Sequence, residues 1–217
     1  MQLFGVPYKA WLVMVVLLVA LAATFRWSTP KNTELHREEL KSEPRAPARP
    51  SRQATLTPGR VVELHTAKGL IEYVLFEEDC PKTTRFVADL IQKGLYSNAK
   101  FTRVDKDSLV KTNPRVKEME PIAPELRNGL IHDKGTVGIS KWSHPSEEAG
   151  AVYICIEPQH HLDFDFTVFG RVISGMDVAQ KIVVGDTIKQ ATIRPLTNID
   201  KQRLRKVLTI QAERRVQ

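Results

Sequence analysis

Two adjacent histidines, His160 and His161, are the residues that most directly suggest a metal site. Imidazole is a common ligand of zinc and other transition metals. Neighbouring residues on a strand point to opposite faces, however, so the two rings would not meet at one ion. The chain also has no Cys-x-x-Cys pair and no Cys/His cluster with the spacing of zinc ligands. We therefore expect no metal and no other cofactor.

Acid–base and nucleophilic chemistry find equally little support in the sequence. Asp163 and Asp165 could act as paired carboxylates, but two aspartates in one loop more often stabilise that loop through side-chain hydrogen bonds. Serine, histidine and aspartate are all present, yet no G-x-S-x-G or similar motif surrounds a serine. We expect a stabilised loop here and no hydrolase.

The two cysteines, Cys80 and Cys155, are far apart in the sequence. Free cysteine is often a core residue, so two separate buried thiols are the interpretation we favour. In an oxidising compartment the two could instead form a disulfide, and their spacing leaves that alternative open.

Arg103 stands in the strand-like segment KFTRV. From its position alone, such an arginine would face outward and form a surface ion pair, an interaction of small energy. Its wider surroundings give it a different interpretation, because the segments on both sides carry the pattern of a known fold.

The elements that must position these side chains begin near Arg60. RVVELHT and GLIEYVL alternate in polarity around a turn near Gly69, which predicts a β-hairpin. PKTTRFVADLIQKGL has helical spacing, a proline in its first turn and Gly94 at its end, which predicts a helix. Further strands are expected at 100–104, 108–112, 136–140, 151–156 and 166–172, then a helix in MDVAQKIVVG and a strand in TIKQATIR.

Three stretches, in order, resemble the cyclophilin family of peptidyl-prolyl isomerases. They are the hairpin and helix segment that ends in KFTRV, the segment PELRNGLIHDKGTVGIS, and the segment HLDFDFTVFGRVISGMDVAQKI. The resemblance implies a mainly β fold: a closed eight-stranded antiparallel β-barrel with two capping helices. We place this cyclophilin-like domain at residues 60–197.

By this resemblance Arg103 is the catalytic residue. Rotation about a peptide bond meets a barrier of about 18–20 kcal/mol because the C–N bond is partly double. When the bond twists, the prolyl nitrogen becomes a better hydrogen-bond acceptor. A fixed donor beside it therefore stabilises the transition state more than either ground state.

The resemblance also assigns the substrate-binding positions, several of which depart from the family's pattern. Ser108 stands where a pocket phenylalanine is usual, Tyr153 also replaces a phenylalanine, and Lys111 and Ala151 replace two glutamines, one of which orients the arginine. The predicted substrate-binding residues are Phe101, Leu109, Lys111, Ala151, Tyr153, His161, Leu162 and Phe166.

Two functions follow from this mixture. One is a peptidyl-prolyl cis-trans isomerase that assists folding of proline-containing chains with weakened activity, as Arg103 and the apolar pocket favour. The alternative is a non-catalytic cyclophilin-like module that binds a peptide or protein, as Ser108, Lys111 and Ala151 favour. In either case we expect a monomer whose partners are proline-containing polypeptides.

An uncharged apolar run at residues 10–25 precedes the domain. Its 16 residues lie between a signal-peptide core and a transmembrane helix in length. We expect residues 1–27 to be a signal-anchor, an N-terminal hydrophobic helix that holds the domain on the extracytoplasmic or lumenal side of a membrane. Cleavage near Ala22, which would release a secreted protein, is the alternative.

The basic residues are concentrated in the flanks of the domain. Residues 61–200 carry 17 basic and 20 acidic side chains, a net charge of −3, although the whole chain has +7. A nucleic-acid-binding domain would concentrate lysine and arginine on its folded surface, so we expect no nucleic-acid partner. Residues 28–59 form a proline- and arginine-rich flexible linker, and residues 198–217 a basic tail that could be helical.

Overall fold

The computed structural model describes residues 2–3, 6–7, 55–114, 116, 119–126, 128–141 and 149–216. Near the N-terminus, β1 (Gln2–Leu3) and β2 (Val6–Pro7) form a two-stranded antiparallel pair. The apolar run at 10–25, its expected helix and most of the linker lie outside the described residues. Among the helices of the described residues, none combines the length and the apolar character that a membrane span requires.

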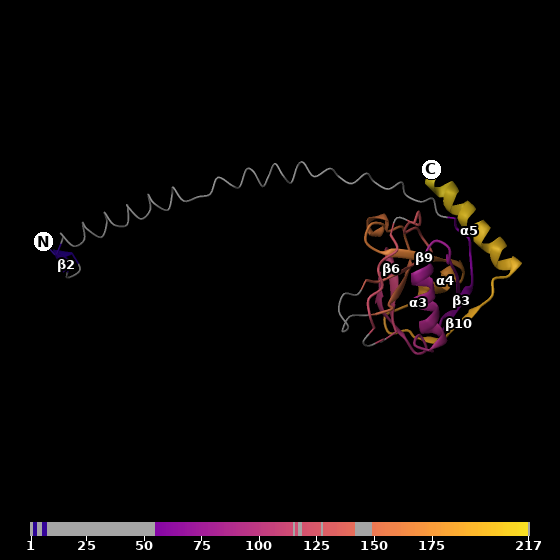
Figure 1. Ribbon diagram of the computed structural model, residues 1–217, viewed down its shortest axis with the longest axis horizontal. Helices are drawn as coiled ribbons and strands as arrows, with labels where there is room; N and C mark the ends of the chain where they lie inside the picture. The colour runs from indigo at the N-terminus through magenta and orange to yellow at the C-terminus, as the bar shows by residue number, and fades with distance from the viewer. Residues whose placement is uncertain are drawn as a thin grey trace. The chain divides into compact units, whose positions relative to one another are not determined.

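An eight-stranded antiparallel sheet forms the body of the domain (Figure 1). The strands run in the spatial order β10-β3-β4-β9-β7-β8-β6-β5. Their bounds are β3 (Val61–Thr66), β4 (Gly69–Leu75), β5 (Lys100–Val104), β6 (Leu109–Asn113), β7 (Thr136–Ile139), β8 (Val152–Cys155), β9 (Thr167–Ser174) and β10 (Ile188–Arg194). Each predicted strand is therefore present, within one or two residues of its expected ends.

The first hairpin, β3–β4, forms as its sequence predicts. Thr66 pairs with Gly69, whose φ of +137° is accessible to glycine because it has no Cβ. The Thr66 hydroxyl donates a hydrogen bond to the Gly69 carbonyl and accepts one from the Lys68 N–H. These bonds close the turn and fix the register of both strands.

The sheet is an open half-barrel, and the predicted closed barrel is wrong in this respect. Lys100 of β5 forms one isolated bridge with Thr187, the residue before β10, and the two edge strands share no ladder in the described residues. Backbone bonds from Asn98 N–H to Ile188 O and from Ile188 N–H to Ala99 O bring the edges together. The Phe101 N–H also donates to Asp186 O and the Gly185 N–H to Phe101 O, so this contact is made mainly by the loop before β10, which begins at Ile188.

Helix α3 (Pro81–Gln92) begins and ends at the residues that its sequence indicates. Pro81 occupies the first turn, where its missing N–H costs nothing. Gly94, at φ +72°, ends the helix, because its N–H donates to Ile91 O and the following N–H, of Leu95, donates to Leu90 O. Val87, Leu90 and Ile91 then face the core of the half-barrel.

Helix α4 (Met176–Lys181) is shorter than the sequence predicted. The chain leaves the helix at Ile182, whose backbone is extended and whose side chain is completely buried. The Lys106 ammonium donates to the Ile182 carbonyl at 2.7 Å, which fixes this exit. The β-branched Val183 and Val184 then lie exposed in a turn that ends at Gly185.

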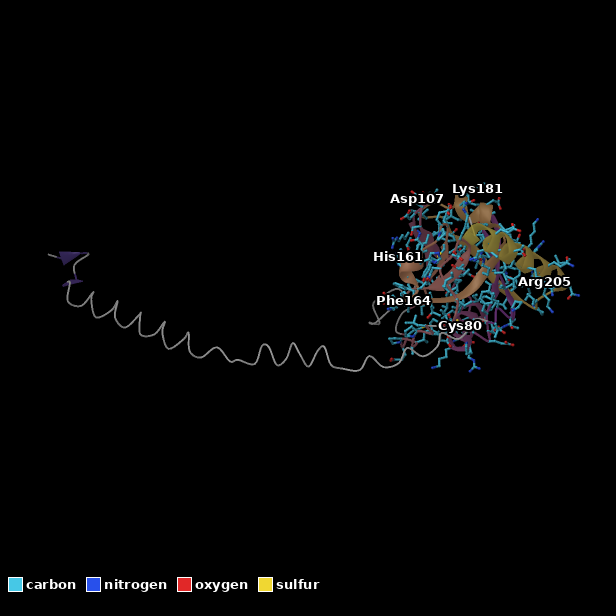
Figure 2. The ribbon with its side chains drawn as sticks, turned by 90° about the horizontal axis from the view of Figure 1, so that it is seen from above. Cys80, Asp107, His161, Phe164, Lys181 and Arg205 are labelled. Carbon is cyan, nitrogen blue, oxygen red and sulfur yellow. The ribbon has the colours of Figure 1, made fainter. Side chains whose placement is uncertain are left out.

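Helix α5 (Asn198–Val216) forms most of the basic tail and packs against β9. It runs along the outside of the sheet, and Arg205 projects from its outer side (Figures 1 and 2). Leu204 is 4% exposed and belongs to a second core cluster with Val61, Val74, Phe76 and Ile173. The tail, which its composition predicted could be helical, is thus a docked helix.

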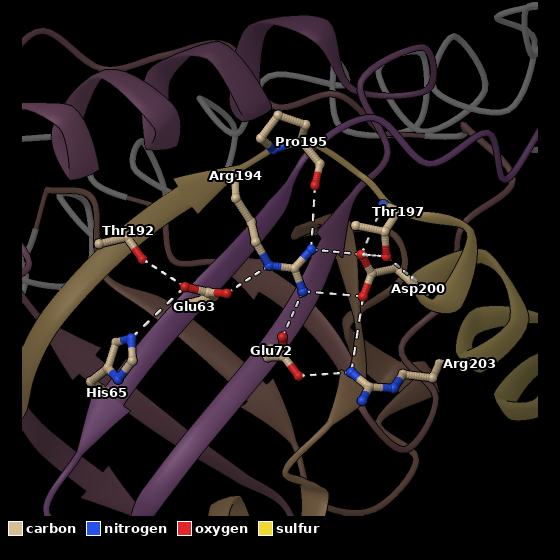
Figure 3. A network of polar contacts seen from close by, with 9 residues as sticks. All are labelled: Glu63, His65, Glu72, Thr192, Arg194, Pro195, Thr197, Asp200 and Arg203. Atoms are coloured by element: carbon tan, nitrogen blue, oxygen red, sulfur yellow. Dashed lines mark hydrogen bonds and ion pairs between the residues drawn. The ribbon is translucent and has the colours of Figure 1, made fainter.

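A charged network fastens the start of α5 to the sheet (Figure 3). Arg194, the last residue of β10, lies 2.6 Å from a carboxylate oxygen of each of Glu63, Glu72 and Asp200. Arg203 of α5 reaches the other oxygen of Glu72 at 3.0 Å. Three strands and one helix therefore meet at a single guanidinium group.

Both cysteines are free and buried, as the first interpretation predicted. Cys80 donates to Val168 O at 3.1 Å and accepts from the Asn128 amide at 2.7 Å. Burial raises the pKa of the Cys155 thiol to about 11. At neutral pH the Cys155 side chain is therefore an unreactive thiol.

Candidate active site

A β-bulge turns Arg103 out of the core. Phe101 pairs with Thr112, but Arg103 pairs with Lys111, so β5 has one residue more than β6 at this point. The extra residue, Thr102, reverses the alternation of the strand. As a result Phe101 is completely buried in the main core, whereas Arg103 is exposed on the outer face.

Arg103 begins a row of residues that crosses the sheet. It pairs with Lys111 of β6, Lys111 pairs with Tyr153 of β8, and Tyr153 pairs with Gly138 of β7. Residues paired in this way have side chains on the same face, with Cβ atoms about 4.5–5.5 Å apart. Arg103, Lys111 and Tyr153 therefore lie in one row on the same face of the sheet, with the lysine between the other two.

An apolar cluster lies on the same face beside this row. Leu109, Tyr153 and Cys155 form its buried part, and Leu162 and Phe166 pack against them. The ring of Phe166 meets Tyr153 edge-on, with centroids 6.3 Å apart. The four predicted pocket residues Leu109, Tyr153, Leu162 and Phe166, from β6, β8 and the 160–166 loop, are thus brought together.

Ser108 keeps the position of a pocket residue but contributes a polar group. Its hydroxyl donates to the side-chain carbonyl of Gln159 at 3.0 Å, and its backbone carbonyl accepts from the N–H groups of Ile156 and Glu157. A hydrogen bond between two loops therefore occupies the place where a ring would stand. Gln159 was not among the predicted site residues.

Three predicted contact residues lie apart from this cluster. Phe101 faces the core, so its ring supports β5 from beneath and does not reach the outer face. Ala151 is completely buried at the start of β8, and its carbonyl accepts from the N–H of Ser140. His161 is exposed at the rim, near Phe164 (Figure 2).

The two histidines lie on a 3-10 turn, η1 (His160–Leu162), and not on a strand as expected. The ring of His160 lies 3.5 Å from both Asp133 and Asp163. Asp163 accepts hydrogen bonds within this region, as the loop interpretation predicted. The described residues contain no group of three or more potential ligands that could hold a metal ion.

His132 is the residue that sequence reasoning missed. Its ring is completely buried, with Nδ1 2.7 Å from Asp163 Oδ1 and Nε2 2.8 Å from the Tyr153 hydroxyl. Burial lowers the pKa of His132, and the hydrogen bond with Asp163 opposes that effect. Tyrosine in place of phenylalanine was the available signal, because a buried hydroxyl needs a partner.

The family comparison agrees with this geometry. The family described as "Cyclophilin type peptidyl-prolyl cis-trans isomerase/CLD" matches residues 61–203. A peptidyl-prolyl cis-trans isomerase of Acinetobacter baylyi is 28% identical over 162 residues, which cover 70% of this chain and 84% of that protein. Peptidyl-prolyl cis-trans isomerase 10 of Caenorhabditis elegans is 31% identical over 137 residues, which cover 59% and 83%.

Solved structures show the same fold. A cyclophilin-type peptidyl-prolyl cis-trans isomerase of Cryptosporidium parvum has a TM-score of 0.56 at 19% identity and covers 64% of this chain and 99% of its own. Cyclophilin AquaCyp293 of Hirschia baltica also has a TM-score of 0.56, at 17% identity, and covers 66% and 77%.

The chain belongs to the cyclophilin-type peptidyl-prolyl cis-trans isomerase family. The resemblance seen in the sequence and the predicted enzyme class are therefore confirmed. The family match begins at the first residue of β3 and ends within α5, so it includes only the start of the helix that the Arg194 network fastens.

Proposed function

We propose that this chain catalyses cis-trans isomerisation of X–Pro bonds, with Arg103 as the donor to the prolyl nitrogen. The observation that carries the proposal is the row that places Arg103 beside an apolar cluster on one outer face. The rings of Tyr153 and Phe166 with the side chains of Leu109 and Leu162 offer an apolar surface for a proline ring.

The reaction asks little more of the protein than this. No bond to a heavy atom is made or broken, so neither a nucleophile nor a proton shuttle is needed. The twisted C–N bond leaves a lone pair on the prolyl nitrogen, and a guanidinium N–H aimed at it lowers the barrier. The side chain of Arg103 has no hydrogen bond or ion pair with the described residues, so its donors are open to a substrate.

The lack of a partner for the Arg103 side chain among the described residues is also the reason for proposing weakened activity. A catalytic donor is effective when it is held in place before the substrate arrives. Lys111 stands directly opposite Arg103 and adds a like charge, and Ala151 is too short to hold a substrate backbone. Loss of one such preorganised group costs about 100- to 1,000-fold in rate.

Proline-containing polypeptides are the proposed substrates. One related structure, the Cryptosporidium parvum isomerase with a TM-score of 0.55 and 20% identity, was solved in the presence of the dipeptide Ala-Pro. Phe164 is 76% exposed at the rim of the apolar cluster, which suits contact with an apolar residue next to the proline. Unfolded chains expose such residues.

An isomerisation assay of the full chain on the tetrapeptide Ala-Ala-Pro-Phe tests the proposal. Arg103→Ala is expected to lower the rate at least 100-fold. Arg85→Ala is the matched control, because Arg85 is an exposed arginine on α3. A rate unchanged by Arg103→Ala, or lowered equally by Arg85→Ala, would refute the assignment of Arg103.

A binding module without turnover is the second candidate, favoured by Lys111, Ala151 and Ser108. The two candidates differ in one measurement. If nuclear magnetic resonance shows that the tetrapeptide binds while cis-trans exchange stays at the uncatalysed rate, the module is correct and the enzyme proposal fails.

We also propose that the run at 10–25 is a membrane anchor and that the domain acts as a monomer on the extracytoplasmic or lumenal side. The length and apolar character of the run support this, and cleavage near Ala22 is the alternative. N-terminal sequencing of the mature protein separates an anchor from a cleaved signal. Protease accessibility in intact vesicles tests the side, and light scattering tests the monomer.

A further inference from the structure

Tyr153 carries a buried hydroxyl in the apolar cluster of the candidate site. Its side chain is 3% exposed, and the hydroxyl has His132 Nε2 as its hydrogen-bond partner at 2.8 Å. The proposed function uses the ring of Tyr153 and leaves this hydroxyl without a role. Leaving a buried hydroxyl without its partner is unfavourable, so the hydrogen bond constrains the positions of both side chains.

The hydrogen bonds run in one direction through the three side chains. Asp163 Oδ1 lies 2.7 Å from His132 Nδ1 and also accepts from the His132 backbone N–H at 2.7 Å. A carboxylate can only accept, so Nδ1 carries the proton of the neutral ring. Nε2 is then an acceptor, and the Tyr153 hydroxyl donates to it.

These bonds connect β8 to the loop that carries Leu162 and Phe166. Tyr153 lies on β8, and Asp163 lies in the loop between Leu162 and Phe166, the two side chains that pack against Tyr153. The ring of His132 also stacks on Tyr153, with an interplanar angle of 14°. The position of the loop relative to β8 is therefore set by hydrogen bonds as well as by packing.

Gly138 makes room for this arrangement. It pairs with Tyr153 across β7 and β8, and a Cβ at this position would lie 2.4 Å from the Tyr153 hydroxyl oxygen. A larger residue would push the ring toward the substrate side. The glycine and the tyrosine thus fit as a pair.

We propose that His132 and Asp163 are positioning residues that act through the Tyr153 hydroxyl to preform the proline pocket. They hold the ring of Tyr153 inward and the loop that carries Leu162 and Phe166 against it. This inference rests on the proposed function and deepens it. It predicts that the network controls substrate affinity, whereas Arg103, on β5, controls the rate of the bound peptide.

Tyr153→Phe removes the hydroxyl and keeps the ring. In exchange spectroscopy with Ala-Ala-Pro-Phe and the full chain, we expect the dissociation constant to rise about 5- to 30-fold, the lower part of the range expected when a buried partner is lost. The exchange rate at saturation should stay within about twofold, because bound peptide still meets Arg103.

Asp163 provides the second variant and a conservative rescue. Asp163→Ala removes the acceptor of both His132 N–H groups and should raise the dissociation constant by about 10- to 30-fold. Asp163→Asn keeps one carbonyl oxygen in the same place, so its dissociation constant should stay within about threefold of the wild-type value.

Two controls separate positioning from general stability. Tyr73→Phe deletes a buried hydroxyl that has no hydrogen-bond partner in the described residues, so affinity should not change. Thr84→Val deletes a buried hydroxyl that donates to Cys80 O at 2.7 Å on α3, so it should lower the melting temperature without changing affinity.

The outcomes distinguish this inference from the proposed function. Unchanged affinity in folded Tyr153→Phe and Asp163→Ala, or an equal loss in Thr84→Val, would overturn the positioning role while the isomerase stands. A loss of rate at saturation with unchanged affinity would overturn it as well. If the wild-type chain binds no proline peptide, the proposed function fails and the inference with it.

Discussion

Two arginines of this domain are placed in opposite ways. Arg194 lies 2.6 Å from each of three carboxylates (Figure 3). The side chain of Arg103, in contrast, has no hydrogen bond or ion pair with the described residues. The carboxylates satisfy the donors of Arg194 inside the protein. The donors of Arg103 remain available for a substrate.

The difference separates a structural junction from a reactive surface. Glu72 and Asp200 are 8% and 1% exposed, so the Arg194 network lies between β10, the β3–β4 hairpin and α5, where ions need partners. Arg103 is exposed and faces Lys111, which repels it. A side chain that must bind a peptide needs hydrogen-bond donors that no other part of the protein uses. The buried charges around Arg194, in contrast, all need partners within the protein.

Arg194→Leu should produce the largest effect on stability. The substitution leaves Glu63, Glu72 and Asp200 close together without their shared cation, which should lower the free energy of unfolding by about 3–5 kcal/mol. Urea unfolding of the full chain measures this. Arg205→Leu, on the outer side of α5, is the control and should change stability by less than about 0.5 kcal/mol.

A loss below about 1 kcal/mol in Arg194→Leu would remove the contrast between the two arginines. It would mean that the network contributes no more than an exposed ion pair does. The isomerisation rate of the folded fraction should be unchanged in this variant, because no residue of the network lies on the Arg103 face.

The second largest effect on stability is expected from low pH, which should weaken the Arg194 network. Hydrogen bonds from Arg194 lower the pKa of Asp200 and of Glu63, so both stay ionised in the folded chain at a pH where the unfolded chain takes up protons. Their contribution to stability is complete above the unfolded pKa values, about 4, and is lost as the pH falls below them.

Urea unfolding between pH 5 and pH 2.5 tests this dependence. The wild-type chain should lose stability steadily below about pH 4, and Arg194→Leu should lose less over the same range, because its carboxylates are no longer stabilised as ions. Parallel curves for the two proteins would contradict the assignment.

Lys111→Gln tests the Arg103 side of the comparison, because it removes the positive charge opposite Arg103. A unit charge opposite Arg103 is worth about 1 kcal/mol in a solvated position, and the glutamine can orient the guanidinium as the family's residue does. We expect kcat/KM to rise about 3- to 10-fold. Lys93→Gln, at the end of α3, is the control and should leave kcat/KM unchanged.

A fall in kcat/KM for Lys111→Gln would show that the lysine assists the substrate and does not disturb Arg103. In that case Lys111 would contact the bound peptide and would not be a cause of weakened activity. An unchanged value would show that the two charges do not interact on this face.

Local signals predicted most of the fold. The hairpin at Gly69 and the limits of α3 follow from residues next to them in the chain, so the sequence shows them directly. Barrel closure depends on β5 and β10, two edges more than eighty residues apart, and no local pattern reports whether they pair. The closed barrel was therefore the largest error in the predicted fold.

The site divides in the same way. The resemblance located Arg103 and the apolar cluster, because motif positions carry over residue by residue. It did not predict the bond between Tyr153 and His132, because these residues lie in separate segments and the bond depends on tyrosine replacing phenylalanine. It also placed Phe101 among the contacts, because a one-residue bulge reverses a strand without any change in the motif.

The smallest expected effect concerns the stability of Arg103→Ala. Since this side chain is exposed and has no partner in the described residues, its removal should change the free energy of unfolding by less than about 0.5 kcal/mol. Urea unfolding beside Arg194→Leu gives the direct comparison. A loss above about 1 kcal/mol would mean that the folded chain already uses Arg103 to hold itself together. The guanidinium would then not be open to a prolyl nitrogen, and weakened activity would have a different cause from the one proposed.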